Sequence, residues 1–246
     1  MNIVNALKFL HQALIKGDEY ARFSLAERIS NKIYNRYKFS EFGRTFLYDK
    51  AFLQYYQRFE NTGNFHSLDR KYALDQLMKL TFSLEGETAE CGVYKGASSY
   101  LICRNIAGRN KSHHIFDSFE GLSRPGAEDG DYWKKGDLAC AEADIRENLK
   151  AFDFVRYYKG WIPDRFSEVV ELRFCFVHLD IDLYQPTLDS LAFFYPRMVP
   201  RGVLLCDDYG FINCPGAQKA MNIYFSDKTE QIVSLPTGQG FVIKEG

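Results

Sequence analysis

Four aspartates follow apolar runs and are the residues best placed for chemistry. Asp180 and Asp182 come after the run 174–179, and Asp207 and Asp208 come after another such run. Carboxylates held close together repel one another unless they are protonated or neutralised by a cation. Because hard divalent ions prefer oxygen ligands, Asp180, Asp207 and Asp208 form a candidate Mg²⁺ site, with Asp182 as a further ligand or supporting group. The alternative is that these aspartates only cap the turns and helices that follow.

A glycine turn and an acidic residue form a second candidate site. Gly92 and Gly96 lie in ECGVYKGASS, which is not the GxGxxG pattern of dinucleotide enzymes. Glu90 before this turn suits a cationic ligand such as S-adenosylmethionine, which carries an ammonium and a sulfonium. Asp117 follows Gly92 at a spacing close to the ~20 residues expected for an acidic side chain that binds ribose hydroxyls, and Glu120 is the second choice. The alternative is a strand-to-helix turn without a ligand.

The elements that must position these residues begin at residue 88, where strand-like and helix-like runs alternate. The predicted strands are 88–93, 114–116, 154–158, 174–179, 202–206, 231–235 and 240–244. The predicted helices are 97–107, 139–152, 163–172, 186–197 and 216–225. This order predicts an α/β, Rossmann-like fold: a seven-stranded, mostly parallel sheet with an antiparallel last strand. Ligands of such sheets bind beyond the carboxyl ends of the strands, where both candidate sites lie.

Residues 1–80 differ from the catalytic domain that we predict over 81–246. Apolar residues recur at helical spacing at Ile3, Leu7 and Leu10, and the segment is dense in Phe and Tyr. We expect a helical N-terminal extension. Its aromatic residues either pack helices on a core or form a lid or dimer surface over an acceptor pocket.

Composition excludes several classes of protein. The chain of 246 residues is 46% hydrophobic with a net charge of −1, so bulk charge gives no reason to expect a nucleic-acid partner. Its apolar runs are far shorter than the ~20 residues of a membrane span, and its first residues do not resemble a signal peptide. The six cysteines form no CxxC pair, which favours free thiols and a cytoplasmic protein.

Six motifs together resemble the macrocin O-methyltransferase (TylF) family. They are ECGVYKGASS, IFDSFEGL, KGWIPDRF, HLDIDLYQPTLDSL, YPRMVPRGVLLCDDYG and PGAQKAM, in that order, over about residues 85–246. Relatives in this family methylate sugar hydroxyls of natural products, and their N-terminal regions help shape the acceptor pocket. The resemblance implies a class I methyltransferase fold, S-adenosylmethionine and Mg²⁺, with the metal on Asp180, Asp207 and Asp208. The cofactor set that we expect is Glu90, Gly92, Tyr94, Ser98, Asp117, Ser118, Gly160, Trp161 and Asp180.

The resulting hypothesis is a metal-assisted O-methyltransferase for a hydroxyl of a small molecule, first of all a sugar or a glycosylated metabolite. Asp180 or Asp182 is the expected general base. The lysine that the related catechol-type enzymes place three residues after the first metal aspartate is Leu183 here. The alternatives are a phenolic or catechol-type acceptor, a nicotinamide-dependent oxidoreductase and a non-catalytic nucleoside-binding protein. We also expect a homodimer or higher homo-oligomer built on the N-terminal helices.

Overall fold

The computed structural model describes residues 3–34, 45–60 and 67–246. The chain forms two compact units, Met1–Glu60 and Asn61–Gly246. The helix α4 (Leu68–Met78) therefore belongs to the second unit, whereas the sequence placed it in the N-terminal extension.

The described part of the first unit is helical. It contains α1 (Ile3–Leu14), α2 (Glu19–Ile33), the 3₁₀ turn η2 (Thr45–Leu47) and α3 (Lys50–Phe59). Asp18 caps α2 by accepting a hydrogen bond from the Ala21 amide at 2.7 Å, and Asp49 caps α3 by accepting one from the Phe52 amide at 2.9 Å. These caps satisfy N–H groups that the first turn of a helix leaves without partners.

The second unit is built on one seven-stranded sheet. Its strands are β1 (Glu87–Cys91), β2 (His113–Asp117), β3 (Val155–Lys159), β4 (Phe174–Leu179), β5 (Met198–Cys206), β6 (Val233–Ser234) and β7 (Gly240–Ile243). They lie in the order β3-β2-β1-β4-β5-β7-β6. The first five strands of this order are parallel, and β7 runs antiparallel to both of its neighbours. The predicted sheet, with its antiparallel last strand, is confirmed.

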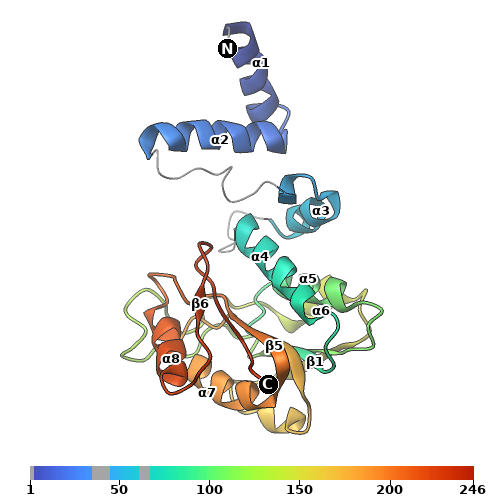
Figure 1. Cartoon of the computed structure of the whole chain (residues 1–246), viewed down its shortest axis with the longest axis vertical. Coiled ribbons are helices and arrows are strands. Elements are labelled where there is room, and N and C mark those ends of the chain that lie inside the picture. The colour runs from blue at the N-terminus through green and yellow to red at the C-terminus, as the bar shows by residue number, and fades with distance from the viewer. Residues whose placement is uncertain (1–2, 35–44, 61–66) are drawn as a thin grey trace. The chain divides into compact units, whose positions relative to one another are not determined.

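Helices cover both faces of this sheet (Figure 1). The remaining elements are η3 (Lys79–Thr81), α5 (Ala97–Ile106), α6 (Glu142–Leu149), η4 (Phe166–Val169), α7 (Tyr184–Phe194), η5 (Tyr195–Arg197) and α8 (Pro215–Phe225). Phe116 of β2 packs in the core with α7 and α8, whereas its neighbour Ile115 packs with α5 and α6. Successive strand residues point to opposite faces, so both faces are apolar and both are covered.

The local predictions differ from the structure in a few places. The helix predicted over 163–172 is reduced to η4, and the peptide bond before Pro163 is cis. The strand predicted over 231–235 is shortened to the two residues of β6. Among the described residues, the helices lack the combined length and apolar character that crossing a membrane requires.

Candidate active site

The carboxyl ends of β1, β4 and β5 lie in register. Leu179 pairs with Cys91 on one side and with Cys206 on the other, so the residues that follow these strands are neighbours. The Asp180 amide donates to the Cys91 carbonyl at 2.9 Å, and the Asp207 amide donates to the Leu179 carbonyl at 2.8 Å. The sheet thereby brings the glycine turn and both aspartate pairs to one edge.

Gly92 stands where only a glycine fits. Its φ is +79°, and a Cβ atom there would lie 1.9 Å from the Asp180 carbonyl oxygen. Both the left-handed backbone and the close approach of the neighbouring strand exclude larger residues. Gly92 therefore lets the ends of β1 and β4 meet.

A first cavity of about 290 Å³ opens beside this turn. Its walls include Gly92, Tyr94, Asp117, Ser118, Gly160 and Trp161 from the predicted cofactor set. Apolar side chains of Leu122, Leu138 and Ile162 complete part of the lining. A cavity that combines apolar walls with polar groups is typical of a site for a small ligand.

Asp117 is held by the backbone of the turns around it. Its carboxylate accepts hydrogen bonds from the amides of Val93 at 2.8 Å and Phe119 at 2.6 Å. Burial raises the pKa of Asp117, although these hydrogen bonds oppose the shift. The side chain therefore stays fixed at the end of β2, as a ribose-binding carboxylate has to be.

Glu90 does not face this cavity. Its side chain is fully buried, accepts a hydrogen bond from the Ser99 hydroxyl and contacts His178 Nδ1 at 2.9 Å and His113 Nε2 at 3.5 Å. It lines neither of the two cavities described here. The expected contact between the Glu90 carboxylate and a cofactor stays a prediction, and in this structure the side chain of Glu90 points to the histidines inside the protein.

A second cavity of about 190 Å³ shares a wall with the first. Five residues line both cavities, namely Gly92, Tyr94, Leu138, Asp180 and Asp182. Ser98, which we expected at the cofactor, lines only the second cavity. Two ligands bound in these cavities would meet at the shared wall.

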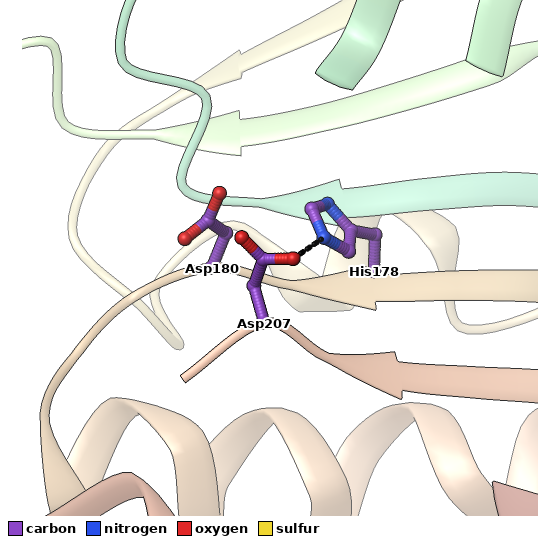
Figure 2. Close-up of side chains that lie close together, drawn as sticks. All are labelled: His178, Asp180 and Asp207. Carbon is purple, nitrogen blue, oxygen red and sulfur yellow. Dashed lines mark hydrogen bonds and ion pairs between the residues drawn. The ribbon is translucent and has the colours of Figure 1, made fainter. Parts of the chain in front are cut away.

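Asp180 and Asp207 lie side by side, with His178 behind Asp207 (Figure 2). One possible ligand atom from each of these three residues lies within 4.8 Å of the others. His178 is fully buried, and its Nε2 contacts the Asp207 carboxylate at 3.3 Å while its Nδ1 contacts Glu90. His178 therefore has partners at both ring nitrogens.

Asp208 points away from this group and toward Asp182. Its carboxylate accepts a hydrogen bond from the Asp182 amide at 2.9 Å, and the Cys214 thiol donates to the Asp182 carboxylate at 3.3 Å. Asp182, Asp208 and Cys214 form a second group with atoms within 4.8 Å of one another. The predicted triad of Asp180, Asp207 and Asp208 thus lines one cavity but is divided between two adjacent groups.

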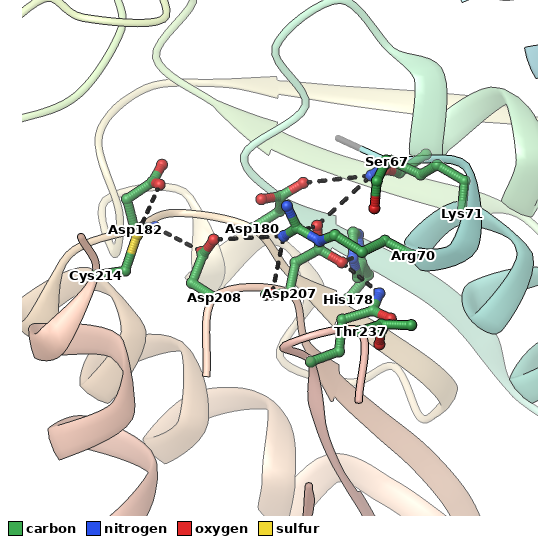
Figure 3. Close-up of polar contacts among 12 residues, drawn as sticks. Ser67, Arg70, Lys71, His178, Asp180, Asp182, Asp207, Asp208, Cys214 and Thr237 are labelled. Atoms are coloured by element: carbon green, nitrogen blue, oxygen red, sulfur yellow. Dashed lines mark hydrogen bonds and ion pairs between the residues drawn. The ribbon is translucent and has the colours of Figure 1, made fainter. Parts of the chain in front are cut away.

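Two buried cations of α4 reach into the aspartates (Figure 3). Arg70 Nη2 lies 2.5 Å from the Asp207 carboxylate, and Lys71 Nζ lies 3.6 Å from it. Lys71 also donates to the Ser98 hydroxyl at 2.6 Å. Neither residue was predicted from the sequence, since charged residues near a helix start are usually solvated and neither carries a motif.

Asp207 is charged, and so is the histidine beside it. Burial acts to raise the pKa of Asp207, but Arg70, Lys71 and His178 outweigh it and hold the pKa well below its ordinary value. Burial acts to lower the pKa of His178, but its hydrogen bonds to Asp207 and Glu90 raise it to about 10. The negative charges of Asp207 and Glu90 and the positive charges around them therefore stabilise one another.

The other aspartates are shifted in the opposite direction. Burial and repulsion by Asp180 raise the pKa of Asp182 to about 7. Burial and repulsion by Asp182 and Asp180 raise the pKa of Asp208 well above its ordinary value. The positive charges of Arg70 and Lys71 therefore do not offset all of the negative charge that the aspartates bring to this edge.

The donor set fits a hard divalent ion. Asp180, Asp207 and Asp208 offer carboxylate oxygens to the second cavity. Oxygen donors are what Mg²⁺ prefers. The raised pKa values of Asp182 and Asp208 indicate that this edge lacks positive charge, which a divalent cation would supply.

Known O-methyltransferases are similar to this chain in sequence. A demethyldecarbamoylnovobiocin O-methyltransferase of Streptomyces niveus is 28% identical over 169 residues, which is 62% of this chain and 64% of that protein. An 8-demethyl-8-(2,3-dimethoxy-alpha-L-rhamnosyl)-tetracenomycin-C 4'-O-methyltransferase of Streptomyces olivaceus is 30% identical over 152 residues, 56% and 58% of the two chains. This chain therefore matches less than two thirds of the length of either relative.

A solved structure of a calicheamicin methyltransferase has the same fold. It superimposes with a TM-score of 0.66 at 18% sequence identity, over 81% of this chain and 84% of that one. The macrocin O-methyltransferase (TylF) family model matches residues 69–232, which include all of α4 except Leu68 and every predicted site residue. This chain belongs to the macrocin O-methyltransferase family.

Proposed function

We propose that the protein is an S-adenosylmethionine-dependent O-methyltransferase that acts on a hydroxyl of a small molecule. The observation that carries this proposal is the wall shared by the two cavities, at Gly92, Asp180 and Asp182. A methyl donor in the first cavity and an acceptor in the second would meet there. Methyl transfer is an in-line displacement, and its rate depends on holding donor and acceptor in one orientation.

The first cavity supports a nucleoside-bearing methyl donor. Asp117 stands at the end of β2 for the ribose, and Trp161 and Ile162 offer an apolar surface to the adenine. Gly92 and Asp180 at the shared wall would border the end of the donor that carries the sulfonium. Glu90 acts on the second cavity instead, because it contacts His178, which in turn contacts Asp207.

The second cavity supports an acceptor with a polar and an apolar face. Tyr132, Trp133 and Phe211 line it together with Arg70 and Lys71. Aromatic walls with a few polar groups suit a sugar ring. One relative is named for a rhamnosyl-bearing substrate, which makes a sugar or a glycosylated metabolite our first choice over a phenol.

Asp182 is the general base of this proposal. It lines both cavities, so its carboxylate is placed to take the proton of an acceptor hydroxyl bound at the shared wall. A positive φ of +59° and the hydrogen bond from Cys214 hold its side chain in place. Asp180, also on the shared wall, is the second choice.

A divalent cation held by Asp180, Asp207 and Asp208 would supply a Lewis acid that lowers the pKa of the acceptor hydroxyl. The chain's own part is to keep these oxygens at one edge of the second cavity, through the register of β4 and β5. Mg²⁺ is the ion that we propose.

We assign the first unit to acceptor binding and self-association, in the cytoplasm. Leu7, Leu14, Ile15 and Ile33 of this unit are each more than 60% exposed, which favours a covered surface in an assembly. The six cysteines are free and five are buried, in keeping with a reducing compartment.

The experiment is a methyl-transfer assay with S-adenosylmethionine and a panel of glycosides, deoxysugar nucleotides and catechols, with Mg²⁺ and with EDTA. We expect S-adenosylhomocysteine formation with a sugar acceptor and its loss in EDTA. Full activity in EDTA would exclude the metal role. Failure to bind S-adenosylhomocysteine in calorimetry would favour a non-catalytic protein, and binding of NAD(H) would revive an oxidoreductase.

A further inference from the structure

Arg70 is in direct contact with the aspartates that follow β5. Its Nη2 donates to the Asp207 carboxylate at 2.5 Å and to the Asp207 carbonyl at 2.9 Å, and it lies 3.8 Å from the Asp208 carboxylate. The guanidinium also stacks on the Phe211 ring, 4.1 Å from its centroid. With its side chain only 7% exposed, Arg70 is a built-in part of this site.

Lys71 supplies a second, more distant cation. Its ammonium lies 3.6 Å from the Asp207 carboxylate and 3.9 Å from that of Asp180, while its short hydrogen bond goes to Ser98. Its contacts to the aspartates are ion pairs without hydrogen-bond geometry. Arg70 is therefore the cation that engages Asp207 directly.

The oxygens that Arg70 neutralises belong to two of the three proposed metal ligands. A divalent cation on the same Asp207 oxygen would stand next to a guanidinium in a buried site, where like charges repel strongly. We propose that Arg70 is an internal counter-cation that competes with the divalent ion for Asp207. This inference rests on the metal site of the proposed function.

The competition sets how tightly the metal binds. Removing the guanidinium frees Asp207 for the ion and removes a repulsion, so the affinity for a divalent cation should rise. The same change leaves Asp207 without its closest partner when no metal is present. A variant without Arg70 should therefore unfold at a lower temperature in EDTA and regain stability when a divalent ion is added.

The experiment measures Mn²⁺ binding to the full chain by calorimetry at one fixed pH. We compare the wild type with Arg70→Met and Arg70→Lys, and with Arg146→Met as the control. Arg146 pairs with Glu142 on the surface and its loss changes the net charge equally. We expect Arg70→Met to bind Mn²⁺ at least about tenfold more tightly, Arg70→Lys to lie between, and Arg146→Met to match the wild type.

Thermal unfolding gives an independent readout. Mn²⁺ should raise the melting temperature of Arg70→Met more than that of the wild type. If Arg70→Met fails to fold in EDTA, Arg70→Lys carries the test, because it keeps the charge but loses the guanidinium nitrogen that donates to both the carboxylate and the carbonyl of Asp207.

An unchanged or weaker affinity in both variants overturns the inference, because Arg70 would then position Asp207 for the metal or act elsewhere. If no variant binds Mn²⁺, the inference also fails. Calorimetry with S-adenosylhomocysteine on the wild type then decides separately whether the proposed methyltransferase function stands without a metal.

Discussion

The two halves of the strand-end edge are stabilised in different ways. At the ends of β1 and β2, neutral backbone amides hold the carboxylate of Asp117. At the ends of β4 and β5, Asp207 is surrounded by Arg70, Lys71 and His178. The first half depends on backbone geometry and the second on balanced charge. Substitutions in the second half should therefore disturb both folding and chemistry.

The largest effect is expected for Asp182→Asn. The amide cannot accept the proton of the acceptor hydroxyl, so kcat should fall by about 10²–10⁴-fold. Affinity for S-adenosylhomocysteine should stay near that of the wild type, because the side chain keeps its shape. Asp227→Asn, on an 80% exposed side chain, is the control and should be neutral. Equal kcat values for Asp182→Asn and the control would exclude Asp182 as the base and move the role to Asp180.

Asp207→Asn should lower the free energy of unfolding by about 3–5 kcal/mol, because it leaves buried Arg70 without its main counter-charge. Chemical denaturation in EDTA measures this change. Glu147→Gln breaks an ion pair with Lys150 in which both side chains are 68% exposed, and should cost less than about 1 kcal/mol. Similar losses of unfolding free energy in Asp207→Asn and Glu147→Gln would show that the charges around Asp207 contribute no more to stability than a surface ion pair does.

Asp117→Ala tests the half that depends on geometry. It removes the carboxylate that we propose binds the ribose hydroxyls, so affinity for S-adenosylhomocysteine should fall by about 10–100-fold, equivalent to about 1.5–3 kcal/mol for hydrogen bonds to a charged group. Isothermal calorimetry measures the affinity, with Asp117→Asn as the conservative variant that keeps the acceptor oxygen. A normal affinity in Asp117→Ala would remove Asp117 from the cofactor site.

The pH dependence of stability tests whether His178 is protonated in the folded protein. The folded-state pKa of His178 is raised to about 10 from 6.5, so its contribution to stability is complete below pH 6.5 and is lost as the pH rises toward 10. In EDTA, the melting temperature of the wild type should fall over this window more than that of His178→Gln. Parallel curves would show that His178 is not protonated in the folded protein.

Much of the site could be predicted because the carboxyl ends of parallel strands meet at one edge. Asp117, Asp180 and Asp207 lie there for that reason alone, and Gly92 was recognised by its place after β1. The reduction of the helix over 163–172 to η4 was not predictable in the same way. Local helical spacing does not reveal whether a short segment has room to continue.

The sequence by itself determined the order of strands and helices and the residues at the strand ends, because alternation and apolar runs are local properties. Only the tertiary structure decided that Glu90 faces His178 and that Asp207 and Asp208 point to different partners. It also brought Arg70 to Asp207, 137 residues away along the chain. Such contacts follow from the packing of α4 over the end of β5, and no spacing within either segment encodes them.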